Sequence, residues 1–494
     1  MNLIKKQGIV NSISLYLGTA LGFINLMIIF QRSLSLEEIG FYNILIAVII
    51  LYTQFASLGI SNVITRFLPF FRTNDKKHHG FATYIFTICC ITFTLFSIGF
   101  LLLKKEVIAL KTDGGKAASL MDQYYGYFFP IAACATLFLI QESFARTSFK
   151  TILPSFLREV VLRLFSTLGA LLILMGAITY RGFIDLYLVG NILLVLIITW
   201  YIVKTKIYRF SSIEPAVKTE YRHMLRFGFY SMLGGSSFAL LQNLDVILIK
   251  LFMGEEMVGI YGTFFAMAQI ITLSSRALNI TSYQIIANAW KENDLYKIEK
   301  IYKKTTLIQC LAGSLLLIGL IANRDNILIL LKKPEYPAYF DVLIIVGIAF
   351  LVDATGGINQ AIIGFSKHYR LVMLFMAIAA TVCFLFNIWL IPQYGLEGAA
   401  WSYLLTMLLT NVSFWLYLKL KFQLQPFNSK IVLIIVISLI SLFVGKFIPI
   451  MPHFIVDIIV RSVTIGGIFI LLSYYSRISP DVNEIIDNFL TRRR

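Results

Sequence analysis

Charged side chains are scarce in this chain: they make up 14% of its 494 residues, whereas 58% of the residues are hydrophobic. A soluble chain of this length needs more polar surface to cover its core, so the scarcity excludes a soluble protein. It predicts instead a protein that crosses a membrane many times. The formal net charge of +17 then reports the orientation of the chain in the membrane, and we expect no nucleic acid among its partners.

Groups for catalysis or for metal binding are also few. The five cysteines fall in apolar stretches, without the spacing of a disulfide framework or a metal site. The five histidines fall in expected loops or at the edges of apolar stretches, and the chain contains no Walker motif, no GxSxG, no HExxH and no DxD-type cluster. No expected loop is long enough for a soluble catalytic domain. These absences argue against an enzyme, and we expect neither a metal nor another cofactor.

Long apolar segments are what the chain has in abundance. They recur from end to end, and they are too long and too uniform for the strands of a barrel. The first of them exceeds the apolar region of a cleaved signal peptide and lacks a small-residue cleavage site. We therefore predict an all-α polytopic membrane protein with about fourteen transmembrane helices. The expected helices are 9–31, 41–64, 81–103, 124–143, 153–178, 183–203, 227–252, 258–281, 305–322, 340–363, 371–391, 397–418, 431–449 and 454–474.

Basic residues gather on the side of the membrane that both chain ends share. The segments 204–226 and 291–304 are rich in lysine and arginine, and the chain ends on Arg492-Arg493-Arg494. Loops rich in lysine and arginine stay in the cytoplasm. We therefore expect both termini in the cytoplasm.

A helix–loop–helix motif occurs twice in the chain. Its loop reads Leu36-Glu37-Glu38-Ile39-Gly40-Phe41-Tyr42 in the first copy and Glu255-Glu256-Met257-Val258-Gly259-Ile260-Tyr261 in the second, so that the glycine and the tyrosine recur 219 residues later. An even number of helices in each half means that the two halves share one orientation, with an axis along the membrane normal between them. The substrate site is then expected between two lobes of six helices each.

The clearest boundary in the chain is the charged segment with Pro215. We predict an N-lobe of helices 1 to 6 at 1–203, a cytoplasmic linker at 204–226 and a C-lobe of helices 7 to 12 at 227–422. Two further helices and a cytoplasmic tail follow at 423–494.

Ionisable residues inside the expected helices form the candidate site, because a charge at membrane depth is costly and usually faces a wet cavity or a partner. The basic candidates are Arg66, Arg163, Lys250 and Arg276, with Asn243 as a polar neighbour. A cavity lined by arginines suits a large anion that carries phosphate or pyrophosphate, since the guanidinium fork matches those oxygens. A cavity dominated by carboxylates would instead suit cationic drugs. Arg66, at the inner end of its helix, could also simply extend to lipid phosphates.

Three of the acidic residues within the expected helices have competing interpretations. Glu142 and Arg146 stand one turn apart and could neutralise each other. Asp245 and Lys250 point about 140° apart around one helix and cannot pair well, so Asp245 needs another partner or water. Asp353 stands beside two glycines and could unwind its helix or bind a cation.

Three short motifs resemble those of a known family. They are the Glu-Glu-x-Gly-x-Tyr type loops of the two copies, the Asp245 helix that leads into Gly259-Ile260-Tyr261, and the turn Tyr394-Gly395-Leu396-Glu397-Gly398-Ala399-Ala400. In their order, and over essentially the whole chain, they resemble the polysaccharide flippases of the multidrug/oligosaccharidyl-lipid/polysaccharide exporter superfamily.

This resemblance implies a V-shaped central cavity and alternating access between the two lobes. It implies a transporter, not an enzyme, that moves undecaprenyl-pyrophosphate-linked oligosaccharide from the inner to the outer leaflet. Membrane lipids and a polysaccharide polymerase are the further partners that it suggests. The pyrophosphate is expected to bind Arg276, Arg163 and Arg66.

Some members of the superfamily are coupled to a cation gradient. Asp245, Glu142 and Asp353 are therefore the candidates for coupling to Na+ or H+ here. No motif in the chain identifies the ion.

Three other functions stay open at this point. A lipid II flippase is a close relative within the superfamily. A cation-coupled drug exporter of the superfamily would normally have twelve spans and an acid-rich cavity. A membrane-embedded glycan-modifying enzyme, from a different class, would need clusters of catalytic His or Asp that the chain lacks.

Overall fold

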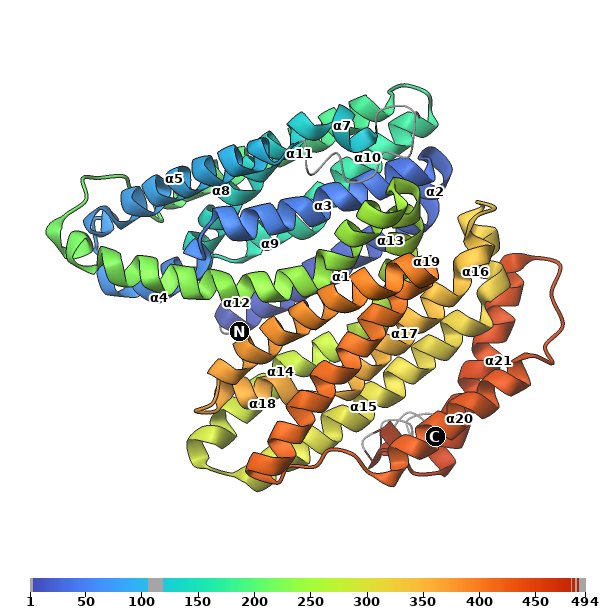
Figure 1. Ribbon diagram of the computed structural model, residues 1–494. Helices are drawn as coiled ribbons and strands as arrows, with labels where there is room; N and C mark the ends of the chain where they lie inside the picture. The colour runs from blue at the N-terminus through green and yellow to red at the C-terminus, as the bar shows by residue number, and fades with distance from the viewer. Residues whose placement is uncertain (1–2, 105–118, 481, 485–486, 488–494) are drawn as a thin grey trace. The chain divides into compact units, whose positions relative to one another are not determined.

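The computed structural model describes residues 3–104, 119–480, 482–484 and 487, and the side chains of residues 3–6, 8, 9, 274, 276, 277, 280 and 281 lie outside this description. Contacts group the chain into two compact units, residues 1–260 and 261–494. Each unit consists of helices joined by short connections (Figure 1). Helices suit an apolar chain in lipid, because they satisfy the backbone N–H and C=O groups within one segment.

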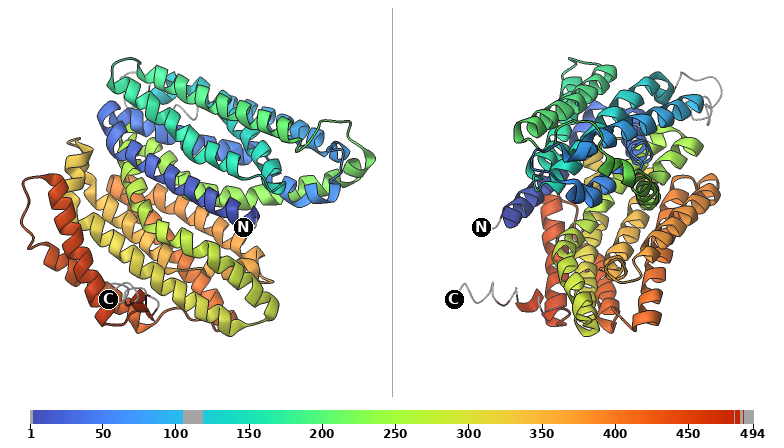
Figure 2. Two further views of the ribbon diagram at one scale, coloured as in Figure 1. Left: turned by 180° about the vertical axis from the view of Figure 1, so that it is seen from behind. Right: turned by 90° about the vertical axis from the view of Figure 1, so that its left-hand side faces the viewer.

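The first unit is built around α3, which lies beside α8 and α12; α8 also lies beside α4 and α11, and α11 beside α10 (Figure 1, Figure 2). The elements from the start of the chain are α1 (Leu3–Ile24), η1 (Asn25–Ile29), α2 (Phe30–Ser33), α3 (Leu36–Ala56), α4 (Ile60–Phe71), η2 (His78–Gly80), α5 (Phe81–Leu102), α7 (Leu120–Gln123), η3 (Tyr125–Tyr127), α8 (Phe128–Thr147), α9 (Ile152–Phe156), η4 (Leu157–Val161), α10 (Leu162–Leu174), α11 (Tyr180–Thr205), α12 (Pro215–Met253) and α13 (Glu255–Ala268). Only the first six residues of α13 belong to this unit.

In the second unit α15 packs against α14, α17 and α20, and α17 packs against α19. The elements after α13 are η5 (Gln269–Thr272), α14 (Leu273–Glu292), α15 (Leu295–Ala322), α16 (Arg324–Leu331), η6 (Tyr336–Tyr339), α17 (Phe340–Thr355), α18 (Asn359–Phe365), α19 (Arg370–Phe422), α20 (Ser429–Gly445) and α21 (Phe454–Tyr475).

Ten helices among the described residues are long and apolar enough to cross a membrane. The prediction of an all-α protein that passes the membrane many times is confirmed. The number differs from fourteen because some expected spans are divided and others are joined. The expected span 153–178 consists of α9, η4 and α10, and 258–281 is divided among α13, η5 and α14. The expected spans 371–391 and 397–418 lie together in α19, and 431–449 corresponds to α20, which is shorter than the ten.

The long element α19 contains one residue with a non-helical backbone, Gly395, at φ 59° and ψ −134°. This conformation is open to glycine and strained for other residues. It falls in the turn that the sequence predicts between the two expected spans.

The expected linker 204–226 is largely helical, because α11 and α12 extend into it from both sides. The irregular residues 206–214 belong to the first unit: the Arg209 N–H donates to the Lys76 carbonyl oxygen at 2.7 Å, and the Glu214 N–H donates to the His79 carbonyl oxygen at 3.1 Å.

The two copies of the repeated motif contact each other within the first unit. The first turn of α3 crosses the first turn of α13 so closely that a Cβ on Gly40 would clash with the Glu255 carbonyl oxygen, and a Cβ on Gly259 with the Leu36 carbonyl oxygen. The contact is reciprocal, because Glu255 follows Leu36 by the same 219 residues that separate the two glycines. Glycine allows the two backbones to approach, as small residues do between membrane helices.

Acidic residues of both copies stabilise helix starts. At α3, the Glu38 N–H donates to Ser35 Oγ at 3.1 Å and the Ser35 N–H donates to the Glu38 carboxylate at 2.8 Å, which is a capping box. In the second copy, the Glu255 carboxylate accepts the N–H groups of Leu120 and Met121 at 3.1 and 3.0 Å, at the start of α7. The two acids therefore have local structural roles.

Alanine at either glycine of this crossing should destabilise the protein. Gly40→Ala and Gly259→Ala each force two backbones apart, and overpacking of this kind costs about 1–3 kcal/mol. We expect a lower temperature of thermal unfolding for both variants in detergent. Gly99→Ala is the matched control, because no atom of a neighbouring element among the described residues lies within 4 Å of a Cβ there. Equal unfolding temperatures for all three variants would show that the crossing is not tight.

Candidate functional site

Five charged side chains of α8, η4 and α10 form a connected cluster in the first unit. Glu142, on α8, is 5% exposed. The Arg158 Nη1 donates to both of its carboxylate oxygens, at 2.9 and 2.8 Å. Arg146, one turn along α8, is also an ion-pair partner, but its Nη2 lies farther away, at 3.6 Å. A buried carboxylate is thus held by two arginines, which offsets the cost of its burial.

The cluster continues through Glu159 to Arg163. Glu159 accepts a hydrogen bond from Arg158 Nε at 3.1 Å, and its other oxygen lies 3.8 Å from Arg163 Nη2. Three arginines against two glutamates leave one net positive charge in the cluster, and Arg163 has the longest ion-pair contact in it. An anion is the kind of ligand that this surplus charge would attract.

Arg163 lies in a notch made by a glycine of α1. A Cβ on Gly22 would lie 3.0 Å from Arg163 Nη1, so the guanidinium packs directly against this glycine. The Arg163 side chain is 35% exposed, so its remaining N–H donors are accessible. Gly22 and Glu159 contact the guanidinium on one side, and the rest of the side chain is exposed. A side chain held in place and still accessible is what a binding site requires.

Arg66 lies on α4 and is exposed. Its guanidinium lies 4.4 Å from the ring centroid of Phe227 and 5.5 Å from that of Phe67, both within the range of a cation–π contact. Aromatic contacts hold this arginine, and the described residues give it no ion pair with an acid.

The three candidates on α12 differ in their surroundings. Asn243 donates to the Ala239 carbonyl oxygen of its own helix at 2.9 Å, which uses one of the two N–H donors of its amide. Asp245 is buried and 4% exposed. Lys250, in the last turn of α12, lines a cavity inside the first unit.

The acidic candidate of the second unit, Asp353, lies just before a break between α17 and α18. Its Oδ1 accepts from Asn411 Nδ2 of α19 at 3.3 Å, and Asn411 Oδ1 accepts from Asn359 Nδ2 at 2.9 Å. Gly357 makes the break at φ 66°, and a Cβ there would lie 2.5 Å from the Thr306 hydroxyl oxygen.

That hydroxyl is buried without a hydrogen-bond partner among the described residues. Interrupted membrane helices with such oxygen groups are typical of cation sites. Groups of three or more His, Cys, Asp or Glu that could hold a metal are absent from the described part of the chain.

Arg276 belongs to α14, and its side chain lies outside the described residues. Of the other predicted residues, the structure brings Glu142 and Arg163 into one cluster. Sequence reasoning missed Arg158, which connects them. The only signal in the sequence is its position next to Glu159, and nothing there indicates the contact with a residue of another helix.

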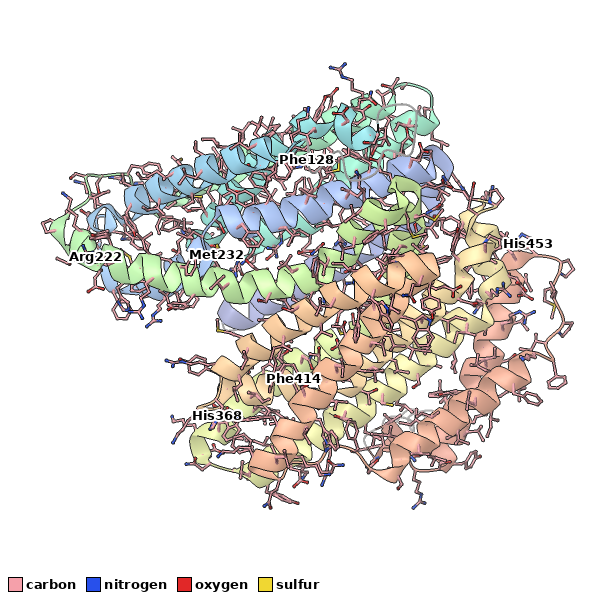
Figure 3. The ribbon with its side chains drawn as sticks, viewed as in Figure 1. Phe128, Arg222, Met232, His368, Phe414 and His453 are labelled. Carbon is pink, nitrogen blue, oxygen red and sulfur yellow. The ribbon has the colours of Figure 1, made fainter. Side chains whose placement is uncertain are left out.

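Removing Arg158 should destabilise the first unit. Arg158→Met leaves the buried Glu142 with Arg146 alone, and loss of a partner by a buried acceptor costs about 1–3 kcal/mol, nearer the lower value because the arginine is half exposed. We expect a lower unfolding temperature in detergent, and recovery of most of it in Glu142→Gln/Arg158→Met. The control is Arg222→Met, an exposed arginine near the start of α12 (Figure 3). A loss of stability in this control as large as in Arg158→Met would contradict the assignment.

Comparisons with known proteins bear on the family and the fold of the chain. A family model described as polysaccharide biosynthesis protein matches residues 4–277 of the chain. An uncharacterized membrane protein of Methanocaldococcus jannaschii is 25% identical over 313 residues. The matched part covers 60% of this chain and 60% of that protein, which is less than two thirds of its length.

Several solved structures share the fold. The lipid II flippase MurJ, in an inward closed conformation, is 16% identical with a TM-score of 0.75, over 95% of this chain and 100% of that one. An inward-facing multidrug resistance MATE family transporter of the MOP superfamily is 13% identical with a TM-score of 0.63, over 84% and 98%. A MATE transporter of Vibrio cholerae is 15% identical with a TM-score of 0.59, over 86% and 98%. The chain has the fold of the MOP superfamily and belongs to the polysaccharide biosynthesis protein family.

Proposed function

We propose that this protein is a transporter that flips undecaprenyl-pyrophosphate-linked oligosaccharide from the inner to the outer leaflet of a bacterial plasma membrane. The observation that carries the proposal is the surplus positive charge of the cluster around Arg163, in a chain of the polysaccharide biosynthesis protein family. A pyrophosphate presents several negatively charged oxygens. A partly exposed guanidinium can donate two parallel hydrogen bonds to a pair of them. The transporter-like fold supports a protein that is not an enzyme.

The transport cycle proposed here is alternating access. About fourteen transmembrane helices form two parallel six-helix lobes, 1–203 and 227–422, around a V-shaped cavity, with two further helices and a tail at 423–494. The lobes rock about the segment 204–226, and both termini lie in the cytoplasm. Binding of the substrate at one face and its release at the other then require no covalent step.

Arg163 is the residue on which pyrophosphate binding is proposed to depend. Arg276 is proposed as a second binding residue, with Arg66, Lys250 and Asn243 as further candidates for contact with the pyrophosphate or the sugars. The lipid tail stays in the bilayer during the cycle. Membrane lipids and a polysaccharide polymerase are the proposed further partners.

Coupling to a gradient of Na+ or H+ is proposed at Asp353. Its support is the set of amide and hydroxyl oxygens around the break between α17 and α18. Asp245 is a second candidate because it is a buried carboxylate in α12. Glu142 is less suited to bind a cation, since two arginines already neutralise its charge.

Lipid II is the second candidate substrate. The observation in its favour is the TM-score of 0.75 with the lipid II flippase MurJ over 95% of this chain. Both substrates carry a pyrophosphate on a long lipid, so the charge of the cluster does not separate them. Drug export is less favoured, because a net positive cluster repels cationic drugs.

Charge reversal at the proposed pyrophosphate site should stop transport. In a strain deleted for this gene, complete lipid-linked oligosaccharide should accumulate on the cytoplasmic leaflet, and wild type should restore its partition. Arg163→Glu and Arg276→Glu should each reduce the rescue about tenfold to hundredfold, since a charge-assisted hydrogen bond contributes about 1.5–3 kcal/mol. The measurement is the leaflet distribution of labelled glycan at equal protein levels in the membrane.

Arg222→Glu is the control for this experiment, because it reverses an exposed charge on α12 outside the cluster, and it should rescue like wild type. Normal partition of the glycan in the deletion strain, combined with altered drug sensitivity, would replace the proposal with the drug exporter. Accumulation of lipid II alone would replace the oligosaccharide with lipid II.

The proposed coupling site makes a separate prediction. Asp353→Asn keeps the hydrogen-bonded shape but removes the charge that a cation requires, so transport should lose its dependence on the gradient and fall about tenfold or more. The measurement is the transport rate in vesicles under a Na+ gradient and under a pH gradient. Asp341→Asn, on the first turn of the same helix, is the matched control. Gradient-dependent transport by Asp353→Asn would move the coupling site elsewhere.

A further inference from the structure

A cavity of about 250 Å³ lies inside the first unit, among α3, α5, α7 and α12. Most of its wall is apolar: it consists of aliphatic side chains of α3 and α12 and of the rings of Tyr52, Phe55, Phe96 and Phe100. Phe55 and Phe96 are stacked with centroids 6.0 Å apart, and the Tyr52 hydroxyl is hydrogen-bonded to Ser97. These groups therefore present a hydrocarbon surface to the cavity, because the Tyr52 hydroxyl is already hydrogen-bonded.

Among the described residues of this wall, Lys250 is the one with a charged side chain. It is 8% exposed, and the described residues give its ammonium neither an ion pair nor a hydrogen bond. The acid whose charge acts on it is Glu255, but the Glu255 carboxylate is already bound to the N–H groups of Leu120 and Met121. Burial also raises the pKa of the Glu255 carboxyl above its ordinary value, which favours the uncharged form of this neighbour.

A buried ammonium is costly unless an anion pairs with it, and a cavity with apolar walls attracts hydrocarbon rather than water. An apolar cavity of about 150 Å³ accepts a benzene molecule, so about 250 Å³ has room for roughly ten carbon atoms of a chain. The lining residues of α3 extend from Ile44 to Phe55, a distance of about 16 Å along a helix, which suits an elongated ligand.

We propose that this cavity binds one hydrocarbon chain of a phosphate-bearing lipid, with the phosphate paired to the Lys250 ammonium. The compact ammonium of a lysine suits a phosphate. Two sources carry this chemistry: an anionic phospholipid of the bilayer, and the polyprenyl phosphate part of a glycan carrier. Only the second source rests on the proposed function.

The test is lipid binding by the purified full-length protein, measured by native mass spectrometry with added dioleoyl phosphatidylglycerol, undecaprenyl phosphate or dioleoyl phosphatidylcholine. Wild type should retain one anionic lipid and little of the zwitterionic one. Lys250→Met keeps the length of the side chain but removes its charge, and it should weaken binding about tenfold or more. Val48→Trp fills the cavity from α3 and should weaken binding to a similar extent while Lys250 is intact.

Lys218→Met is the matched control, because it removes an exposed lysine from the other end of the same helix, and its binding should equal that of wild type. Unfolding temperatures identify any variant that fails to fold. If Val48→Trp fails to fold, lipid binding by Lys250→Met alone decides between the outcomes. Retention of phosphatidylglycerol assigns the site to a bilayer lipid, and retention of undecaprenyl phosphate alone assigns it to the carrier.

Equal binding by wild type, Lys250→Met and Val48→Trp would overturn the proposal, as would equal binding of the zwitterionic lipid. Because binding is measured without transport, loss of glycan flipping with intact lipid binding contradicts only the proposed function. Loss of lipid binding with intact flipping contradicts only this proposal.

Discussion

The ion pair between buried Glu142 and Arg158 illustrates the constraint that arranges the polar groups of this protein. A charge away from water is costly unless it has a partner, and the charged residues inside the helices differ in how far they are paired. Glu142 is paired with two arginines, whereas the one acid paired with Arg163 among the described residues lies 3.8 Å away. The described residues give Lys250 no ion pair, and it lines a cavity. Both proposed binding sites therefore rest on a positive charge that the protein neutralises poorly.

A second constraint is the close approach of backbones where the two copies of the motif cross. Any larger side chain at Gly40 of α3 or at Gly259 of α13 would clash with the facing backbone. Glu38 and Glu255 stabilise the starts of α3 and α7. The same residues that make the repeat visible in the sequence thus make the contact in the structure. Packing at the crossing requires glycine at these two positions of the chain.

Sequence reasoning found the helices well, because long apolar segments leave the backbone no other way to satisfy its polar groups. It also found the Glu142–Arg146 pair, which follows from the spacing of one helix. It missed the shorter contact with Arg158 and the hydrogen bond of Asp353 with Asn411, because their partners are distant in the chain and lie on other helices. It could not foresee the cavity beside Lys250, because a cavity depends on the packing of several helices. The count of spans differed where local breaks divide an apolar segment.

Transport by the purified protein tests the central claim most directly. The measurement is the rate at which undecaprenyl-pyrophosphate-linked oligosaccharide crosses the bilayer of reconstituted vesicles, detected by a glycosidase added outside. The account predicts a rate at least about tenfold above that of protein-free vesicles, and a return to that background with Arg163→Glu. Equal rates with and without the protein, or full transport by Arg163→Glu, would contradict it.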